Sequence, residues 1–299
     1  SLIRSRFRSC DFKGASMSKK INSVLLVIHP TRNEALNTGK ELAKLLREKD
    51  LDVYATIKLD GANEFDESSK VDLAVVLGGD GTMLRASEIF RGKKLPILGI
   101  NLGHVGFLAE IERPSLSDIA SAITNGSFEI EERMSLSYQL LRGGKLLQSG
   151  WALNEVTIER NDHQMIDLFV QIDHRPLSRW WCDAVICATP TGSTAYAYSA
   201  GGPVVWPEVD ALVLLPLAAH ALFTRPMVIS PRSEIVIDIE SESADLNADG
   251  IRRTKLQKND RVVLTSDKED VLLAHIKPAA FADRLVAKFK LPVEGWRGE

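Results

Sequence analysis

The sequence lacks long apolar segments. Its longest uninterrupted apolar stretch runs from Ala211 to Ala219 and contains a proline, whereas a helix that crosses a bilayer needs about 20 apolar residues. Residues 1–20 also lack the apolar region found in secretory signals. The sequence therefore predicts a protein with no membrane segment and no membrane partner.

Cysteine is scarce as well. Cys10, Cys182 and Cys187 match neither a disulfide framework nor the spacing of a structural zinc site. The six histidines form no metal-binding set with them, so we expect no metal bound by protein ligands. Few cysteines in a chain of this length indicate a reducing compartment, and we expect a cytoplasmic protein.

The chain has no large excess of charge. Its 299 residues are 44% hydrophobic and 26% charged, with a net charge of −3, which is typical of soluble globular proteins. Residues 1–20 are basic, and the remainder carries about −8. We expect residues 1–20 to be a disordered basic leader outside the fold, with translation starting at Met17. An acidic body predicts no nucleic-acid partner.

The pattern of expected helices and strands changes near Gly126. Before it, strand-like and helical segments alternate, which is typical of a parallel sheet covered by helices. The expected strands are Ser23–His29, Asp52–Ile57, Asp72–Leu77 and Leu95–Ile100, and the expected helices are Glu34–Lys49, Thr82–Phe90 and Pro114–Thr124. We assign residues 21–127 to this α/β domain.

After Gly126 most segments have the pattern of strands, and we assign residues 128–278 to a β-rich domain. The expected strands are Leu136–Leu141, Lys145–Gln148, Ala152–Glu159, Leu168–Asp173, Val185–Ala188, Leu212–Leu215, Glu234–Glu240, Arg261–Ser266 and Val271–Ile276. Residues Ala279–Lys290 have apolar side chains at helical spacing and predict a final helix.

Two glycine-rich turns follow neighbouring strands of the α/β domain. The first, Gly78-Gly79-Asp80-Gly81-Thr82, opens a helix, where backbone N–H groups can approach phosphate oxygens. An acid beside a phosphate is unfavourable unless it holds a metal or accepts a proton, so Asp80 needs a function. A flexible corner with a capping Asp is the alternative. The second turn spans Gly99–Leu108, and tight loop packing would also explain its glycines.

The β-rich domain contains a long segment of small and hydroxyl-bearing residues, Asp183–Pro203. Such residues let a flat ring lie against the backbone, and hydroxyls can donate to or accept from a base edge. A hydroxyl-rich turn that caps a helix is the simpler alternative. The pair Asn154-Glu155 begins a strand, and Asn247-Ala248-Asp249-Gly250 predicts a hairpin turn.

In combination and in this order, GGDGT, GHVGFL, NE, DAVICATPTGSTAYAYSAGGP and NADG resemble the NAD kinases. Within that family, the segment Ala219-His220-Ala221-Leu222-Phe223 with Arg225-Pro226 resembles the actinobacterial branch most. The resemblance extends from about Ser23 to Ile276. GGDGT also occurs in diacylglycerol-kinase-like lipid kinases and, as a variant, in phosphofructokinases, but the TPTGSTAY block separates the families. A lipid or sugar kinase and a non-enzymatic nucleotide-binding module are the alternative functions.

The resemblance implies a Rossmann-like open α/β domain, a C-terminal all-β sandwich domain, and a last helix within residues 279–299 that returns to the first domain. It also implies an enzyme that phosphorylates the 2′-hydroxyl of the adenosine ribose of NAD with ATP, or polyphosphate, to give NADP. A divalent cation, Mg²⁺, would be carried by the nucleotide phosphates. The resemblance further implies a homodimer or homotetramer.

Site residues follow from the matched motifs. Asp80 matches the proton acceptor, Asn154 and Glu155 match the pair that holds the ribose, and Asp183 matches an acid at the nicotinamide end. The other expected NAD contacts are Asp80 itself, Gly81, Arg85, Phe107, Thr191, Thr194, Ala195, Tyr196, Ser199 and Asp249, and the expected phosphate contacts are Gly78, Gly79, Gly81 and Arg32. The chain departs from the family around Asp183, where Trp180-Trp181 precede the acid and Ala184 takes the place of a glycine.

Overall fold

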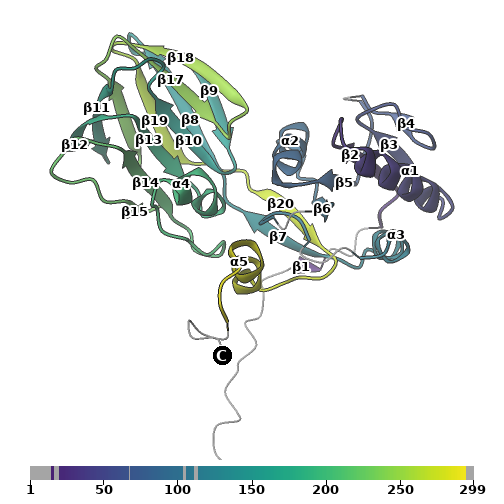
Figure 1. Ribbon diagram of the computed structural model, residues 1–299. Coiled ribbons are helices and arrows are strands. Elements are labelled where there is room, and N and C mark those ends of the chain that lie inside the picture. Colours follow the sequence, from purple (N-terminus) through teal and green to yellow (C-terminus); the bar gives the residue numbers. More distant parts are fainter. Residues whose placement is uncertain (1–14, 17–19, 67, 104–105, 111–113, 294–299) are drawn as a thin grey trace, which may run out of the picture.

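The computed structural model of the chain describes residues 15–16, 20–66, 68–103, 106–110 and 114–293. These residues form one α/β layer structure and two antiparallel β-sheets, followed by a C-terminal helix (Figure 1). The predicted fold class is therefore confirmed.

The first sheet has eight strands in the described part of the chain, in the order β1-β7-β20-β6-β5-β2-β3-β4. Its centre is parallel, and β7 runs antiparallel to β20 and β1. The strands are β1 (Ala15–Ser16), β2 (Ser23–Ile28), β3 (Asp52–Ala55), β4 (Asn63–Glu64), β5 (Leu73–Gly78), β6 (Ile97–Asn101), β7 (Glu129–Arg133) and β20 (Val271–His275). Both β2 and β5 are buried along their whole length because helices or the second domain cover both faces.

Helices cover the two faces of this sheet differently. On one face, α1 (Asn33–Arg47) and α3 (Leu116–Asn125) bury Leu42 and Ile119 against the strands. On the other face, α2 (Asp80–Phe90) packs together with Trp151 of the second domain. Helix α2 therefore lies between the first sheet and the β-rich part of the chain (Figure 1).

Two six-stranded antiparallel sheets, counted over the described residues, form the β-rich part. One has the order β15-β14-β13-β10-β17-β18 and the other β12-β11-β16-β19-β8-β9. They enclose a common apolar core that includes Trp180 and Tyr138. The strands are β8 (Leu136–Arg142), β9 (Lys145–Ala152), β10 (Glu155–Glu159), β11 (Ile166–Ile172), β12 (Arg175–Cys182), β13 (Ala184–Ala188), β14 (Leu212–Leu217), β15 (Met227–Ile229), β16 (Ile235–Ile239), β17 (Ser243–Ala248), β18 (Arg252–Gln257) and β19 (Arg261–Ser266).

Strand membership differs from the division at residues 127 and 128. Strands β7 and β20 lie in the range assigned to the β-rich domain, yet they belong to the first sheet, where Leu273 pairs with Ile97 of β6 and Ala274 with Ile130 of β7. The chain therefore enters the β-rich part after Arg133 and leaves it before Val271. Within the expected leader, Ala15–Ser16 form β1 and pair with β7. The rest of 1–19, including Cys10 and Met17, lies outside the described residues.

The final helix α5 (Phe281–Phe289) returns to the first domain, as expected. The ring of Phe107 lies 5.8 Å from that of Phe281 and 5.7 Å from that of Phe289, between ring centroids. The same two rings of α5 also contact Tyr198 and Trp206 of the β-rich part. No helix of the described residues combines the length and the apolar character needed to cross a membrane.

Candidate active site

Asp80 is the first residue of α2 and follows β5 directly. The sequence predicted that the helix begins at Thr82. In the structure it begins two residues earlier, at Asp80, directly after Gly79, whose backbone is extended. Its carboxylate accepts hydrogen bonds from the backbone N–H groups of Phe107 at 3.0 Å and Leu108 at 3.2 Å. The two glycine-rich turns therefore meet at Asp80, as the common sheet edge predicts.

The glycines of the first turn differ in their surroundings. A β-carbon on Gly79 or Gly81 would meet no atom within 4 Å, whereas one on Gly78 would lie 2.4 Å from Oγ1 of Thr82. Open space above Gly79 and Gly81 leaves room for phosphate oxygens at the start of α2. Arg32 and Arg85 are both exposed.

A second centre forms around Asp249. This residue has a positive φ of 55° in the turn between β17 and β18, which confirms the predicted hairpin turn. Its carboxylate accepts hydrogen bonds from the backbone N–H groups of Leu153 (2.8 Å), Asn154 (2.7 Å) and Glu155 (3.3 Å), and its own N–H donates to Glu155 at 3.0 Å. The carboxylate of Asp249 thus holds the Asn154–Glu155 turn, and its expected contact with a ligand stays a prediction.

Glu155 is the most perturbed carboxyl group of this centre. Its residue is only 8% exposed, and its Oε2 has no hydrogen-bond partner among the described residues. Burial and the nearby charge of Asp249 together raise the pKa of Glu155 to about 8. At neutral pH the side chain is therefore mostly protonated and can donate a hydrogen bond, for instance to a ribose oxygen.

The hydroxyl-rich segment packs directly against the same turn. The N–H of Thr189 donates to the carbonyl of Asn154 at 2.9 Å, and a β-carbon on Gly192 would lie 2.0 Å from that carbonyl oxygen. Glycine is therefore required at 192 for this close approach. The 3₁₀ turn η1 (Thr191–Thr194) and the short helix α4 (Tyr196–Ser199) follow, and the backbone of Tyr196 donates to the carboxyl of Glu155.

The other expected residues of this segment differ in exposure. Thr191 is buried and its hydroxyl accepts a hydrogen bond from Arg133 at 3.2 Å. Thr194 and Ala195 are half-buried, and Tyr196 and Ser199 are exposed. The structure thus brings Asn154, Glu155, Asp249 and residues 189–196 into one cluster.

Asp183 and Phe107 are among the expected residues that lie outside this cluster. Asp183 lies between β12 and β13 and forms an ion pair with Arg160 at 3.1 Å. The ring of Phe107 is 5% exposed and packs against α5. Shortly before Asp183 in the sequence, Trp180 is fully buried in the sheet core, whereas Trp181 is 52% exposed and makes an edge-to-face ring contact with His220.

Sequence reasoning missed several buried charges. Arg133 is 2% exposed and pairs with Glu131 at 2.9 Å, and Glu131 contacts His275 at 2.9 Å. Burial raises the pKa of Glu131, but His275 and Arg133 outweigh it and hold that pKa at about 2. No local pattern could reveal that these charges are buried together, because His275 contacts Glu131 from 144 residues away.

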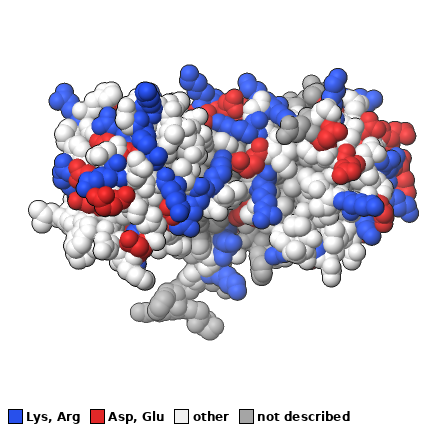
Figure 2. Space-filling view, turned by 90° about the horizontal axis from the view of Figure 1, so that it is seen from above, with Lys and Arg blue, Asp and Glu red and all other residues white. Residues whose placement is uncertain are grey.

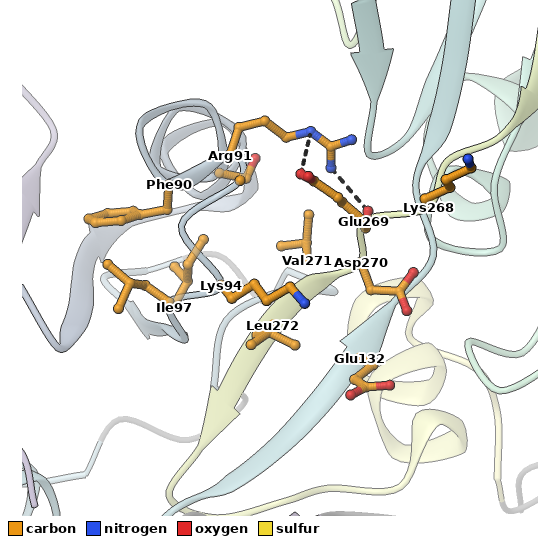
Figure 3. Close-up of a pocket in the computed structure, with 13 residues that line it drawn as sticks. Phe90, Arg91, Lys94, Ile97, Glu132, Lys268, Glu269, Asp270, Val271 and Leu272 are labelled. Atoms are coloured by element: carbon orange, nitrogen blue, oxygen red, sulfur yellow. Dashed lines mark hydrogen bonds and ion pairs between the residues drawn. The ribbon is translucent and has the colours of Figure 1, made fainter. Parts of the chain in front are cut away.

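Two described cavities lie beside the cluster rather than in it. The larger, about 1000 Å³, lies between β7, the loop after α4 and α5. The smaller, about 210 Å³, lies between the end of α2 and β20, where Arg91, Lys94, Lys268, Glu132 and Asp270 surround it (Figure 3). No expected site residue lines either one.

Charges of both signs are mixed over the surface. In Figure 2, Lys and Arg side chains alternate with Asp and Glu over the face seen from above, without a field of one sign. The net negative charge of residues 21–299 is therefore not concentrated on this face, and nearby Lys or Arg side chains can attract a bound anion. Among the described residues, no group of three or more His, Cys, Asp or Glu could hold a metal ion.

Comparison with known proteins now gives the family. The ATP-NAD kinase N-terminal domain matches residues 60–128, and the ATP-NAD kinase C-terminal domain matches residues 153–276. The NAD kinase of Thermobifida fusca is 43% identical over 96% of this chain and 95% of its own length. The chain belongs to the NAD kinase family. The NAD kinase of Corynebacterium diphtheriae is also 43% identical, over 92% of this chain and 93% of its own.

Solved NAD kinase structures agree with the fold. The yeast NADH kinase complexed with NADH superimposes with a TM-score of 0.84 at 24% identity, covering 94% of this chain and 90% of its own. The Archaeoglobus fulgidus NAD kinase in complex with ATP gives a TM-score of 0.70 at 26% identity, covering 90% and 98%. Membership in the NAD kinase family makes the chain a kinase.

Proposed function

We propose that this chain transfers the γ-phosphoryl group of ATP to the 2′-hydroxyl of the adenosine ribose of NAD, giving NADP and ADP. The observation that carries the proposal is the pair of centres described above, Asp80 at the start of α2 and the Asn154–Glu155 turn held by Asp249. Family membership supports NAD and ATP as the substrates.

Asp80 would accept the proton of the 2′-hydroxyl as its oxygen attacks the γ-phosphorus. Hydrogen bonds from Phe107 and Leu108 fix the orientation of its carboxylate. General-base assistance of this kind contributes about 10²–10⁴-fold to the rate. The rest of the rate enhancement comes from positioning, because phosphoryl transfer needs little covalent help from the protein.

The remaining residues would bind NAD and the phosphates and orient them for the transfer. Asn154 and the protonated carboxyl of Glu155 would hold the ribose, and Thr194, Ala195, Tyr196 and Ser199 would form the wall around NAD. Thr191, Asp183 and Phe107 are proposed to complete the NAD site at its margins. The backbone at Gly78, Gly79 and Gly81 would approach phosphate oxygens, with Arg32 and Arg85 supplying positive charge.

ATP would enter as its Mg²⁺ complex, in which the phosphates supply the ligands of the ion. The ion would therefore enter and leave as part of the substrate. The positive charge of Mg²⁺ would offset the net negative charge of residues 21–299. We also propose a cytoplasmic location, supported by the buried free thiols of Cys182 and Cys187.

Self-association as a homodimer or homotetramer is proposed from exposed apolar side chains. Trp181, Leu222 and Phe223 are each more than half exposed, and Leu222 fully so. Trp181 contacts His220, which lies two residues before Leu222 in the sequence, and contiguous exposed apolar side chains mark interaction surfaces. Light scattering of the purified chain would show a mass two or four times that of one chain, and a monomer would contradict the proposal.

One assay tests the function. The purified chain is incubated with NAD, a phosphoryl donor and Mg²⁺, and NADP is measured with an NADP-specific dehydrogenase. We expect NADP with Mg²⁺–ATP and none after addition of excess EDTA. A parallel reaction with polyphosphate tests the second donor, and a reaction with NADH tests the reduced acceptor. Absence of NADP with every donor would contradict the proposal.

A further inference from the structure

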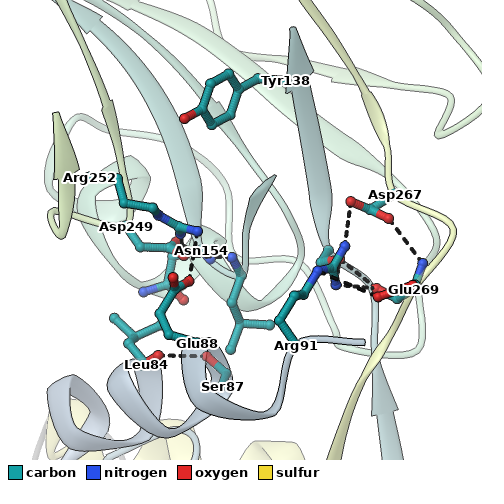
Figure 4. Close-up of polar contacts among 12 residues, drawn as sticks. Leu84, Ser87, Glu88, Arg91, Tyr138, Asn154, Asp249, Arg252, Asp267 and Glu269 are labelled. Carbon is teal, nitrogen blue, oxygen red and sulfur yellow. Dashed lines mark hydrogen bonds and ion pairs between the residues drawn. The ribbon is translucent and has the colours of Figure 1, made fainter. Parts of the chain in front are cut away.

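Helix α2 is joined to the β-rich part of the chain at two places along its length (Figure 4). Oε1 of Glu88 lies 2.6 Å from Nη1 of Arg252 on β18. At the end of the helix, Nη2 of Arg91 lies 2.5 Å from Oδ2 of Asp267, and Nη1 donates to Ser135 at 3.3 Å. Both connections start from the helix whose first residue is Asp80.

The contact at Glu88 continues to the Asn154–Glu155 turn. Nη2 of Arg252 donates to Oδ2 of Asp249 at 2.9 Å, and the same carboxylate holds the N–H groups of Leu153, Asn154 and Glu155. An unbroken series of polar contacts therefore connects α2 with the backbone that is proposed to bind the ribose. Figure 4 shows Glu88, Arg252, Asp249 and Asn154 lying close together.

Arg252 is held in place from several sides. Its guanidinium lies over the ring of Trp151, 5.0 Å from the centroid, and that of Arg91 lies 4.3 Å from the same ring. The side chains of Arg252 and Glu88 are 22% and 33% exposed, and that of Asp249 is 2% exposed. Partial burial strengthens an ion pair relative to one on the surface. The geometry thus favours one fixed arrangement.

We propose that Glu88 and Arg252 are positioning residues for the phosphoryl transfer, which fix α2 and its Asp80 relative to the Asn154–Glu155 turn. The inference rests on the proposed function, since it assigns the ribose to that turn and the proton to Asp80. Glu88 lies about 12 Å along the helix axis from Asp80, at 1.5 Å per residue. A shift of the helix against the turn is therefore transmitted to Asp80, and about 1 Å of misplacement can cost 10²-fold in rate.

The variant Glu88→Gln tests this directly, because it keeps the size of the side chain and removes its charge. Asp249 and Arg252 still hold the turn in this variant, so the ribose still binds. We expect kcat to fall about 10-fold, with KM for NAD within about 2-fold of the wild type. In Arg252→Gln, Asp249 also loses its counter-charge, so both a lower kcat and a higher KM for NAD are expected.

Arg253→Gln is the matched control. Arg253 is the next residue of β18 and pairs with Asp245, on the opposite side of the strand from Arg252. Like Arg252→Gln, the variant Arg253→Gln removes one positive charge from β18. We expect it to keep the wild-type kcat and KM. The double variant Glu88→Gln/Arg252→Gln should be no slower than Arg252→Gln alone, because both changes break one connection.

Structural damage is measured separately from positioning. Thermal unfolding of each variant shows whether it folds, and amide hydrogen exchange at Leu153, Asn154 and Glu155 reports the turn even without activity. Exchange there should be faster in Arg252→Gln and unchanged in Arg253→Gln. If the wild type makes no NADP, the proposed function fails, while the exchange result still tests the connection.

Three results would overturn the proposal. The first is a wild-type kcat in folded Glu88→Gln, and the second is an equal loss of kcat in Arg253→Gln. The third is unchanged exchange of the turn in Arg252→Gln.

Discussion

Gly106 lies so close to Asp80 that a β-carbon on Gly106 would stand 2.2 Å from Oδ1 of Asp80. The second glycine-rich turn thus closes over the carboxylate, and the N–H groups of the next two residues, Phe107 and Leu108, donate to it. No other residue type at 106 leaves the carboxylate where it is. The two turns that the sequence singled out act together at this point.

Gly106→Ala should therefore lower activity through Asp80. The added methyl group displaces the carboxylate, and we expect kcat to fall about 10²-fold. In an Asp80→Asn background the same substitution should have little further effect, since residues that act as one unit are not additive. Steady-state kinetics of the two single variants and the double variant check this. Additive losses would show that Gly106 acts elsewhere.

Glu155 predicts a specific dependence of stability on pH. The pKa of about 8 in the folded protein lies above the ordinary value of 4.5. Between these pH values the folded state binds more protons than the unfolded state, so stability decreases as pH rises from about 4.5 to 8. Each pKa unit corresponds to about 1.4 kcal/mol.

Glu155→Gln removes this titration. The variant should be more stable than the wild type by about 1–3 kcal/mol at pH 8 and similar to it at pH 4.5. Urea unfolding at several pH values measures the difference. A difference that does not grow with pH would contradict the raised pKa.

The sequence was most informative where the pattern was local. The apolar segment Ser23–His29 predicted β2, and the Asn247–Gly250 signal predicted the turn that carries Asp249. The sequence could not show that β7 and β20 join the first sheet, since Leu273 pairs with Ile97, far away along the chain. Strands β12, β17 and β18 were missed because polar side chains interrupt their apolar pattern.

The buried pair of Glu131 and Arg133 predicts a large effect on stability. The pKa of Glu131, about 2, means that the pair contributes above about pH 4.5 and is lost as pH falls toward 2. Glu131→Gln removes the counter-charge of the buried Arg133 and should cost about 3–5 kcal/mol at pH 7. The exposed Glu132, next to Glu131, provides the control. The substitution Glu132→Gln should change the free energy of unfolding by about 0.5 kcal/mol or less. Equal effects from the two substitutions would contradict the account.

The two adjacent tryptophans should differ in how much stability the same substitution costs. Trp180→Ala removes a fully buried ring and should cost about 3–5 kcal/mol. Trp181 is 52% exposed, so Trp181→Ala should cost less than about 1 kcal/mol. Chemical unfolding checks both. A large loss in Trp181→Ala would place that ring in an interface, and KM for NAD measured alongside shows whether its bulk affects binding near Asp183.

Asp80 as the proton acceptor in NAD phosphorylation is the central claim. The most direct test compares NADP formation from NAD and Mg²⁺–ATP by the wild type and by Asp80→Asn, with NAD affinity measured by calorimetry on both. We predict NADP formation by the wild type, and a kcat about 10²–10⁴-fold lower in a variant that still binds NAD. A variant with near-wild-type kcat would contradict the account.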